Sequence, residues 1–391
     1  MKNTLLTKKN RFTFSDICIT AAYLSLAVVS SYIAFLTFDV KFPSILIFIA
    51  FFFLATLKTI LNSGAKLHMV IFFLVLRFFF FLINCLVLRV DTNEITEQAV
   101  VTVCSVLIFF YCYNEFTDIG KILLPFTLLT SVQVFYAFIT NGFSTEKTFI
   151  VAGIGDSNYI ATFLLFSIAY YLFSKTSVIQ KITLLLSVPA LLLTQSFACY
   201  LALFVVGVVW VIKTVNWHST KSVAIFVACC MVTALSCICF TNTKFGYPIV
   251  EKIKDKLTFL ASGDMRNFSS SRVELYRFSI DNIKRHILFG SIKNENLMIS
   301  SLFQNFRTHN LVLESLLLYG IVGSLLNIVI FYYAIKSFKR NKNMAYIMVF
   351  IAVIVHGFFE PNFFTMHFEL FIWLIIGASL GEANKRGTVH V

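Results

Sequence analysis

The sequence predicts an all-α, polytopic membrane protein with about 12 transmembrane helices and one large external loop that contains amphipathic helices. Hydrophobic residues make up 58% of the 391 positions, and charged residues make up only 13%. A soluble domain is nearer to about half apolar and about a quarter charged. Apolar runs of about 18–25 residues recur along the chain, which is the length that a helix needs to cross a bilayer core. Residues 1–391 are therefore predicted to form a single membrane domain.

The predicted spans can be placed in chain order from these apolar runs. The first run follows a basic segment at residues 2–11 and is longer than the apolar core of a signal peptide, so we interpret it as a retained span. Residues 194–196 form a polar turn between the seventh and eighth spans. The predicted spans lie near residues 17–38, 42–60, 67–88, 96–113, 120–140, 157–174, 178–195, 197–213, 221–241, 309–335, 342–358 and 362–381.

The distribution of lysine and arginine predicts the orientation in the membrane. Short cytoplasmic loops carry an excess of these residues, whereas loops longer than about 60 residues escape the rule. With the N-terminus in the cytoplasm, roughly 17 basic residues of the short loops fall inside and roughly three fall outside. We therefore expect both termini in the cytoplasm, and the long loop on the outer face of the membrane.

Residues 242–308 form the long polar connection between the ninth and tenth spans. Apolar residues recur at helical spacing between positions 250 and 260, which predicts an amphipathic helix that ends before Gly263. A second helix is predicted to begin at Ser271, where Glu274 completes a capping box, and to end at Gly290. The two helices could lie on the lipid surface or form the roof of a cavity.

Composition also excludes several classes of function. The net charge of +13 does not indicate nucleic-acid binding, because the basic residues lie mostly in loops between spans and no soluble domain carries them. The nine cysteines fall within or at the ends of apolar runs and do not have the spacing of a metal site. An external reaction has no nucleotide available, so it must use a substrate that was activated beforehand, such as a lipid-linked diphosphate sugar.

His309 lies where the long loop ends and the tenth span begins. The N-terminus of a helix carries partial positive charge, which disfavours an imidazolium, so we expect a neutral imidazole that could accept a proton. Asn310 and Glu314 are four positions apart and share one helix face, where Glu314 could hold Asn310 or line a cavity. The alternative is a polar cap on a membrane helix, with Gly320 and Gly323 allowing close packing.

Other polar residues lie at the outer ends of spans. Asp156 and Asn158, at the start of the sixth span, could hold sugar hydroxyls, or they could simply cap the helix. Arg272 and Arg277, in the long loop, could clamp a diphosphate, because a guanidinium matches phosphate geometry, or they could belong to a solvated face. Arg77 lies within the third span, where an arginine is either functional or paired with a carboxylate such as Glu314.

Taken together, these residues resemble the O-antigen ligase and O-antigen polymerase superfamily over roughly residues 150–380. His309-Asn310, nine residues, Gly320, two residues and Gly323 are similar to the family's H[NSQ]-x9-G-x-x-[GTY] signature, which follows a large periplasmic loop. Residues 155–159 (GDSNY) are similar to a G-D-P-N-Y segment, and residues 193–196 (LTQS) to an L-T-x-S-R segment. Residues 270–290 look like the family's loop pattern, and residues 356–360 (HGFFE) look like its ending.

The resemblance implies a glycosyltransferase that uses an undecaprenyl-diphosphate-linked glycan and requires no metal or other cofactor. It implies His309 as the base and Arg272 as the group that offsets charge on the departing diphosphate. The implied substrate-binding residues are Asp156, Asn158, Asn310, Glu314, Arg277 and Arg77. A chain-length regulator is a candidate protein partner, membrane lipid surrounds the protein, and no nucleic acid is expected.

One departure from the family pattern favours a polymerase over a ligase. Phe197 occupies the position where the family commonly has an arginine that is thought to hold the lipid diphosphate, and ligases usually keep that arginine. The alternative within the family is a ligase that transfers the polymer to the lipid A core. The alternative from another class is a flippase for lipid-linked oligosaccharides, although the polar groups gather at one face and no repeat is visible.

Overall fold

The computed structural model describes most of the chain as helices. The described residues are 13–33, 41–61, 65–89, 92–115, 118–143, 157–174, 177–241, 243, 246–264, 272–291, 308–360 and 366–388. Within these ranges the regular structure is α-helical throughout, which confirms the all-α part of the predicted fold class. Helices suit a membrane because their backbone N–H and C=O groups bond to one another and do not need water.

Each predicted span coincides with one helix. These helices are α1 (Phe14–Ile33), α2 (Lys41–Ile60), α3 (Met69–Leu88), α4 (Thr92–Asn114), α5 (Ile119–Thr140), α7 (Ser157–Phe173), α8 (Val178–Leu193), α9 (Phe197–Thr214), α10 (Thr220–Thr241), α14 (Leu311–Asn341), α15 (Met344–Gly357) and α16 (Met366–Thr388). Among the described residues, four helices are long and apolar enough to cross a membrane: α3, α5, α9 and α14. Shorter apolar stretches lie in α1, α2, α4, α7, α8 and α15, so the number of crossings stays a prediction.

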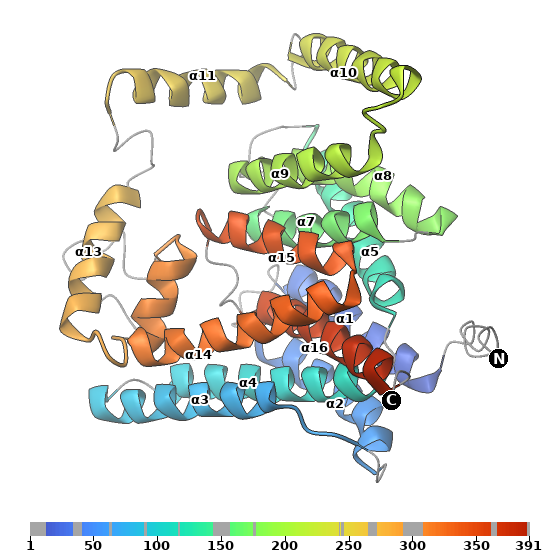
Figure 1. Cartoon of the computed structure of the whole chain (residues 1–391). Coiled ribbons are helices and arrows are strands. Elements are labelled where there is room, and N and C mark those ends of the chain that lie inside the picture. Colours follow the sequence, from blue (N-terminus) through green and yellow to red (C-terminus); the bar gives the residue numbers. More distant parts are fainter. Residues whose placement is uncertain are drawn as a thin grey trace, which may run out of the picture.

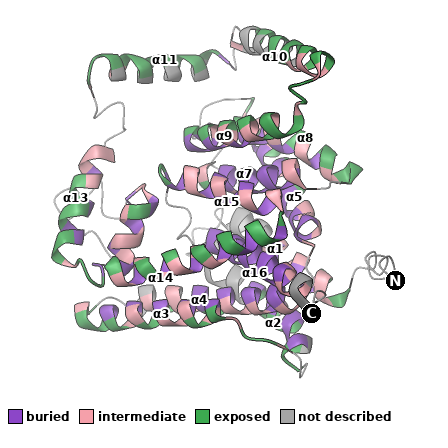
Figure 2. Cartoon of the chain, in the orientation of Figure 1, coloured by how far each residue is buried: buried purple, intermediate pink, exposed green. Residues whose placement is uncertain are grey.

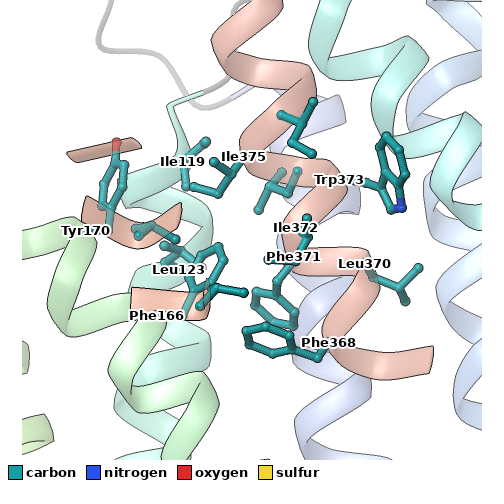
Figure 3. Packing of buried hydrophobic residues seen from close by; sticks show 14 of the residues in the cluster. Ile119, Leu123, Phe166, Tyr170, Phe368, Leu370, Phe371, Ile372, Trp373 and Ile375 are labelled. Carbon is teal, nitrogen blue, oxygen red and sulfur yellow. The ribbon is translucent and has the colours of Figure 1, made fainter. Parts of the chain in front are cut away.

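The helices pack into a bundle around α16. Its residues Phe368 and Phe371 lie among the rings of neighbouring helices (Figure 3). The ring of Phe371 has its centroid 4.7 Å from that of Tyr23 on α1 and 5.7 Å from that of Phe166 on α7. The Tyr23 hydroxyl also donates to the Leu370 carbonyl oxygen at 3.0 Å. The N-terminal, middle and C-terminal parts of the chain therefore share one core.

The start of α1 and the end of α16 lie at the same end of this bundle. Tyr111, near the end of α4, interacts with Asp16 at the start of α1. Glu115, just after α4, accepts a hydrogen bond of 3.1 Å from Thr59 and interacts with Lys385 near the end of α16. Figure 1 shows α13 (Arg272–Arg285) at the opposite end. An even number of membrane crossings would place the two ends of the chain on the same side in this way.

The long loop contains the two helices that the sequence predicted. They are α11 (Tyr247–Ala261) and α13, which ends at Arg285 and not at Gly290 as predicted. Ser271, the predicted start of the second helix, lies outside the described residues. Figure 1 shows α10 and α11 beyond α9, at the margin of the structure, and Figure 2 shows most of their described surface exposed. By contrast, α13 packs against the first part of α14. The second loop helix is therefore part of the bundle end at which the tenth predicted span begins.

Helix α14 is broken at Gly320, whereas the sequence predicted one continuous span there. Gly320 has φ 60° and ψ −165°, and the helix changes direction at this point (Figure 1). The break frees backbone groups that the segment after α13 satisfies: Ile321 N donates to the Ile287 oxygen at 2.9 Å, and Ser291 N donates to the Leu317 oxygen at 2.8 Å. A Cβ on Gly320 would lie 2.4 Å from the backbone of Leu288, so only glycine allows this approach.

Candidate functional site

Glu360 lies at the centre of a polar cluster at the α13 end of the bundle. Its Oε1 accepts a hydrogen bond of 2.7 Å from Arg272 Nη2 and one of 3.3 Å from Asn158 Nδ2. Its Oε2 lies 2.7 Å from His309 Nδ1. We refer to Asn158, Arg272, His309 and Glu360 as the Glu360 cluster. Its members come from the start of α7, the start of α13, the turn before α14 and the segment after α15, so only the folded chain brings them together.

Local structure at the ends of helices fixes the position of each member. The Asn310 side chain caps α14 by accepting from Val312 N at 3.0 Å and from Leu313 N at 3.1 Å. His309 immediately precedes this cap and has φ 51°, in the left-handed region. Glu360 extends the end of α15, where its backbone N donates to the His356 oxygen at 2.9 Å. The functional side chains therefore project from helix termini rather than from unsupported loops.

The surroundings keep Glu360 ionised. Burial alone would raise the pKa of this carboxyl. The hydrogen bond from His309 and the positive charge of Arg272 outweigh burial, and together they lower the pKa below its ordinary value of 4.5. Glu360 is therefore a carboxylate at neutral pH.

An ionised Glu360 determines how His309 can act. A carboxylate that contacts Nδ1 keeps a proton on that nitrogen, which leaves the other ring nitrogen, Nε2, as the basic atom. The same carboxylate stabilises the imidazolium that forms when Nε2 takes up a proton. The carboxylate–imidazole pair can therefore support general base chemistry.

A second hydrogen-bonded pair joins α7 and α15 behind the cluster. His356 is buried, and its Nε2 lies 3.3 Å from the Thr162 hydroxyl. That hydroxyl donates to the Asn158 carbonyl oxygen at 2.6 Å. The pair links the helix that carries Asn158 to the helix that leads to Glu360.

Several residues that the sequence singled out lie near the cluster but make other contacts. Asn310 Nδ2 is 3.3 Å from the Phe358 oxygen, so this side chain ties the turn to the end of α15. Glu314 is buried and accepts hydrogen bonds from Thr308. Arg277 is exposed and lies about 140° around α13 from Arg272, away from Glu360. Asp156 lies outside the described residues.

Arg77 belongs to a separate cluster inside the bundle. Its Nη2 lies 2.5 Å from Glu369 Oε1, and its Nη1 donates to Asn327 Oδ1 at 3.1 Å. The guanidinium also lies 5.0 Å from the centre of the Tyr319 ring. The suggested pairing with Glu314 is wrong, because α16 supplies the carboxylate.

The predicted turn at residues 194–196 is present. Thr194 caps the end of α8, and its hydroxyl donates to the Leu191 oxygen at 2.6 Å. Phe197, where the family pattern has an arginine, begins α9 and is 44% exposed. Among the described residues, no three His, Cys, Asp or Glu side chains come together as a metal site would require.

Sequence reasoning missed Glu360 as a site residue. The available signal was a carboxylate at the end of an apolar helix, four residues after a histidine within that helix. Charged and ionisable groups at that depth are rare and tend to be functional. The partner of Glu360 lies 51 positions earlier in the chain, so its role emerges only from the fold.

The fold and the cluster define a helical membrane protein with a carboxylate–histidine pair and an arginine at one end of its bundle. The family model described as O-antigen ligase matches residues 182–328, which is less than half of the chain. This match confirms the resemblance to the O-antigen polymerase and ligase superfamily, whose members are glycosyltransferase-like enzymes. The matched residues include Arg272, His309 and Gly320. The match does not support the alternative function as a flippase. No curated protein matches the chain.

Proposed function

We propose that this protein is a membrane glycosyltransferase that polymerises undecaprenyl-diphosphate-linked oligosaccharide repeat units into O-antigen or capsular polysaccharide. The observation that carries the proposal is the contact of 2.7 Å between His309 and the ionised Glu360, with Arg272 bound to the same carboxylate. Such a pair suits the removal of a proton from a sugar hydroxyl, and a guanidinium suits a diphosphate leaving group.

In the proposed reaction, the acceptor hydroxyl attacks the anomeric carbon of the donor glycan while His309 Nε2 takes its proton. The bond between that carbon and the diphosphate oxygen breaks, and the diphosphate leaves with the electron pair. Glu360 holds Nδ1–H and stabilises the imidazolium. The proton is then returned to the departing diphosphate or to solvent, so that the base is restored.

Arg272 is well suited to offset the charge that grows on the diphosphate. A guanidinium has five N–H donors, and the bond to Glu360 uses one of them. Its side chain is 30% exposed, whereas that of Glu360 is 8% exposed. We assign Asn158 and Asp156 to sugar positioning, Asn310 to holding the turn that carries His309, and Arg277 to attraction of the anionic lipid from the exposed face of α13.

We also infer that the chain crosses the cytoplasmic membrane twelve times with both termini in the cytoplasm, and that the Glu360 cluster faces outward. The shared position of the start of α1 and the end of α16 supports an even number of crossings. The lysine and arginine distribution supports the direction. A chain-length regulator would then approach from the outer face, where α11 and α13 lie.

The second candidate is an O-antigen ligase that transfers the finished polymer to a lipid A core sugar. The matched family model carries that description. Polymerase remains the first candidate, because Phe197 stands where ligases usually have an arginine. The two reactions differ only in the acceptor, so the acceptor is what an experiment must vary.

The test uses purified protein in detergent with a lipid-linked repeat unit, either alone or with lipid A core. We expect the wild type to form a ladder of polymers from the repeat unit alone, and His309→Ala to reduce the rate about 10²- to 10⁴-fold. Product only in the presence of lipid A core would favour the ligase. A wild-type ladder from His309→Ala would exclude the proposed base. Movement of lipid across sealed vesicles without new glycosidic bonds would indicate a flippase.

A further inference from the structure

The turn that carries His309 has a backbone conformation that needs external support. His309 has φ 51°, in the left-handed region that residues other than glycine adopt with difficulty. Histidine enters this region more often than most residues do, but the conformation is still uncommon and gains from contacts that hold it. The conformation matters, because the backbone at this residue sets the direction in which the imidazole leaves the turn toward Glu360.

Glu314 supplies that support from the first turn of α14. Its Oε2 accepts two hydrogen bonds from Thr308, one from the backbone N at 2.9 Å and one from the hydroxyl at 2.7 Å. Thr308 is 0% exposed and Glu314 is 3% exposed, so water does not compete for these bonds. The Thr308 hydroxyl also lies 3.0 Å from the Asn310 carbonyl oxygen, and of these two contacts the one with Glu314 is the shorter.

These bonds are not needed to cap the helix. Asn310 already accepts from Val312 N and Leu313 N, the donors that a cap serves. The carboxylate of Glu314 instead reaches back beyond the cap to Thr308, the residue before His309.

On the other side of the turn, α13 holds His309 directly. The Tyr276 hydroxyl donates to the His309 carbonyl oxygen at 3.2 Å. The turn is therefore fixed at Thr308 by Glu314, at His309 by Tyr276 and at Asn310 by its own cap. Of these three contacts, the bond from Thr308 to Glu314 is the shortest, and Thr308 directly precedes the strained residue His309.

We propose that Glu314 is a positioning residue: it anchors Thr308 and thereby holds His309 in the left-handed conformation that brings Nδ1 to Glu360. This role replaces the substrate contact that the sequence suggested for Glu314. The inference rests on the proposed function, because its main measure is the rate of glycosyl transfer.

The test compares Glu314→Ala and Thr308→Val with the conservative Thr308→Ser, all purified and assayed with the lipid-linked repeat unit. Thr308→Ser keeps both donors and should restore a rate within about twofold of wild type. Glu314→Ala should lower kcat about 10- to 100-fold with little change in KM, because a small displacement of a catalytic group is enough for such a loss. Thr308→Val, which keeps the shape and loses one donor, should fall between them.

The same substitutions in a His309→Ala background separate positioning from general damage. Positioning predicts no further loss there, whereas a structural defect would lower the residual rate again. Wild-type kcat in both Glu314→Ala and Thr308→Val would overturn the inference, and so would a raised KM with unchanged kcat, which would indicate substrate contact. If Glu314→Ala does not fold, Thr308→Val decides alone. Full activity of His309→Ala would instead refute the proposed base and hence the proposed function.

Discussion

Two arginine–glutamate pairs in this protein have nearly the same local chemistry but different surroundings. Arg272 and Glu360 are 2.7 Å apart at the end of the bundle, with side chains 30% and 8% exposed. Arg77 and Glu369 are 2.5 Å apart inside the bundle, with side chains 2% and 1% exposed. The first pair includes a histidine and reaches solvent. The second is enclosed by Asn327, Tyr319 and Trp373.

The difference in exposure indicates what each arginine–glutamate pair can do. An enclosed pair in which each charge meets the other joins helices, here α3 and α16, and offers no route to a substrate. A pair that leaves part of the guanidinium exposed can bind an anion without losing its partner. The presence of an arginine–glutamate pair alone would have made Arg77 and Arg272 equal candidates, so exposure is the property that separates them.

The sharpest test of this comparison makes one substitution at both glutamates. Glu360→Gln should reduce polymerisation about 10²- to 10⁴-fold with only a small decrease in melting temperature at neutral pH, because a neutral amide cannot stabilise the imidazolium of His309 as a carboxylate does. Glu369→Gln should lower the melting temperature in detergent but leave the activity per folded molecule near wild type. If both variants lose activity to the same extent while folded, the two pairs do not have separate roles.

Removing one partner of the enclosed pair should cost more stability than removing both. Arg77→Leu leaves Glu369 buried without a cation and should destabilise the bundle by about 3–5 kcal/mol. Arg77→Leu combined with Glu369→Leu should recover much of this loss. Thermal unfolding in one detergent measures both values. A double variant less stable than Arg77→Leu would contradict a purely structural pair.

Arg272 has a matched control on its own helix. Arg272→Lys keeps a charge near Glu360 but loses the planar fork, so we expect about a tenfold lower kcat/KM. Arg277→Lys, on the exposed face, should change kcat/KM less than about twofold. Initial rates at several concentrations of the lipid-linked donor measure both. Wild-type behaviour of Arg272→Lys would exclude recognition of the diphosphate by a guanidinium fork.

The smallest expected effect is a pH dependence of stability that originates from Glu360. Its pKa lies below 4.5 in the folded protein, so its ionised form stabilises the fold above that pH. This contribution is lost as the pH falls through the lowered pKa, because the proton then binds folded and unfolded chains alike. The difference in melting temperature between wild type and Glu360→Gln should therefore shrink as the pH falls from 6 to about 3. If the difference in melting temperature stays constant over this pH range, protonation of Glu360 does not weaken the fold as predicted.

Much of the fold could be predicted because each helix has a local cause. Apolar runs of spanning length and the polar residues at the start of the tenth predicted span are visible in the chain, and helices begin or end close to them. Even the two helices of the long loop follow from local periodicity. The break at Gly320 could not be predicted, because it depends on the segment after α13 taking up the freed backbone groups.

The candidate site was predictable only in part. His309, Arg272 and Asn158 were found from their place at helix ends, and the structure brings all three to one carboxylate. That carboxylate, Glu360, was not predicted, and Glu314 was only an example of a carboxylate that could pair with Arg77, whereas the structure pairs Arg77 with Glu369. Both errors concern pairs that are far apart in the sequence, for which periodicity carries no information.

By itself, the sequence determined that the chain is helical, where the helices lie, which of its loops is large, and which residue types stand at the helix ends. It could do so because hydropathy, capping and turn chemistry act over a few residues. Only the tertiary structure decided which charges meet, which arginine is enclosed and how the turn at His309 is held. Those outcomes depend on which helix faces pack together, and the energy of a buried charge depends on whatever group the fold places within a few ångströms of it.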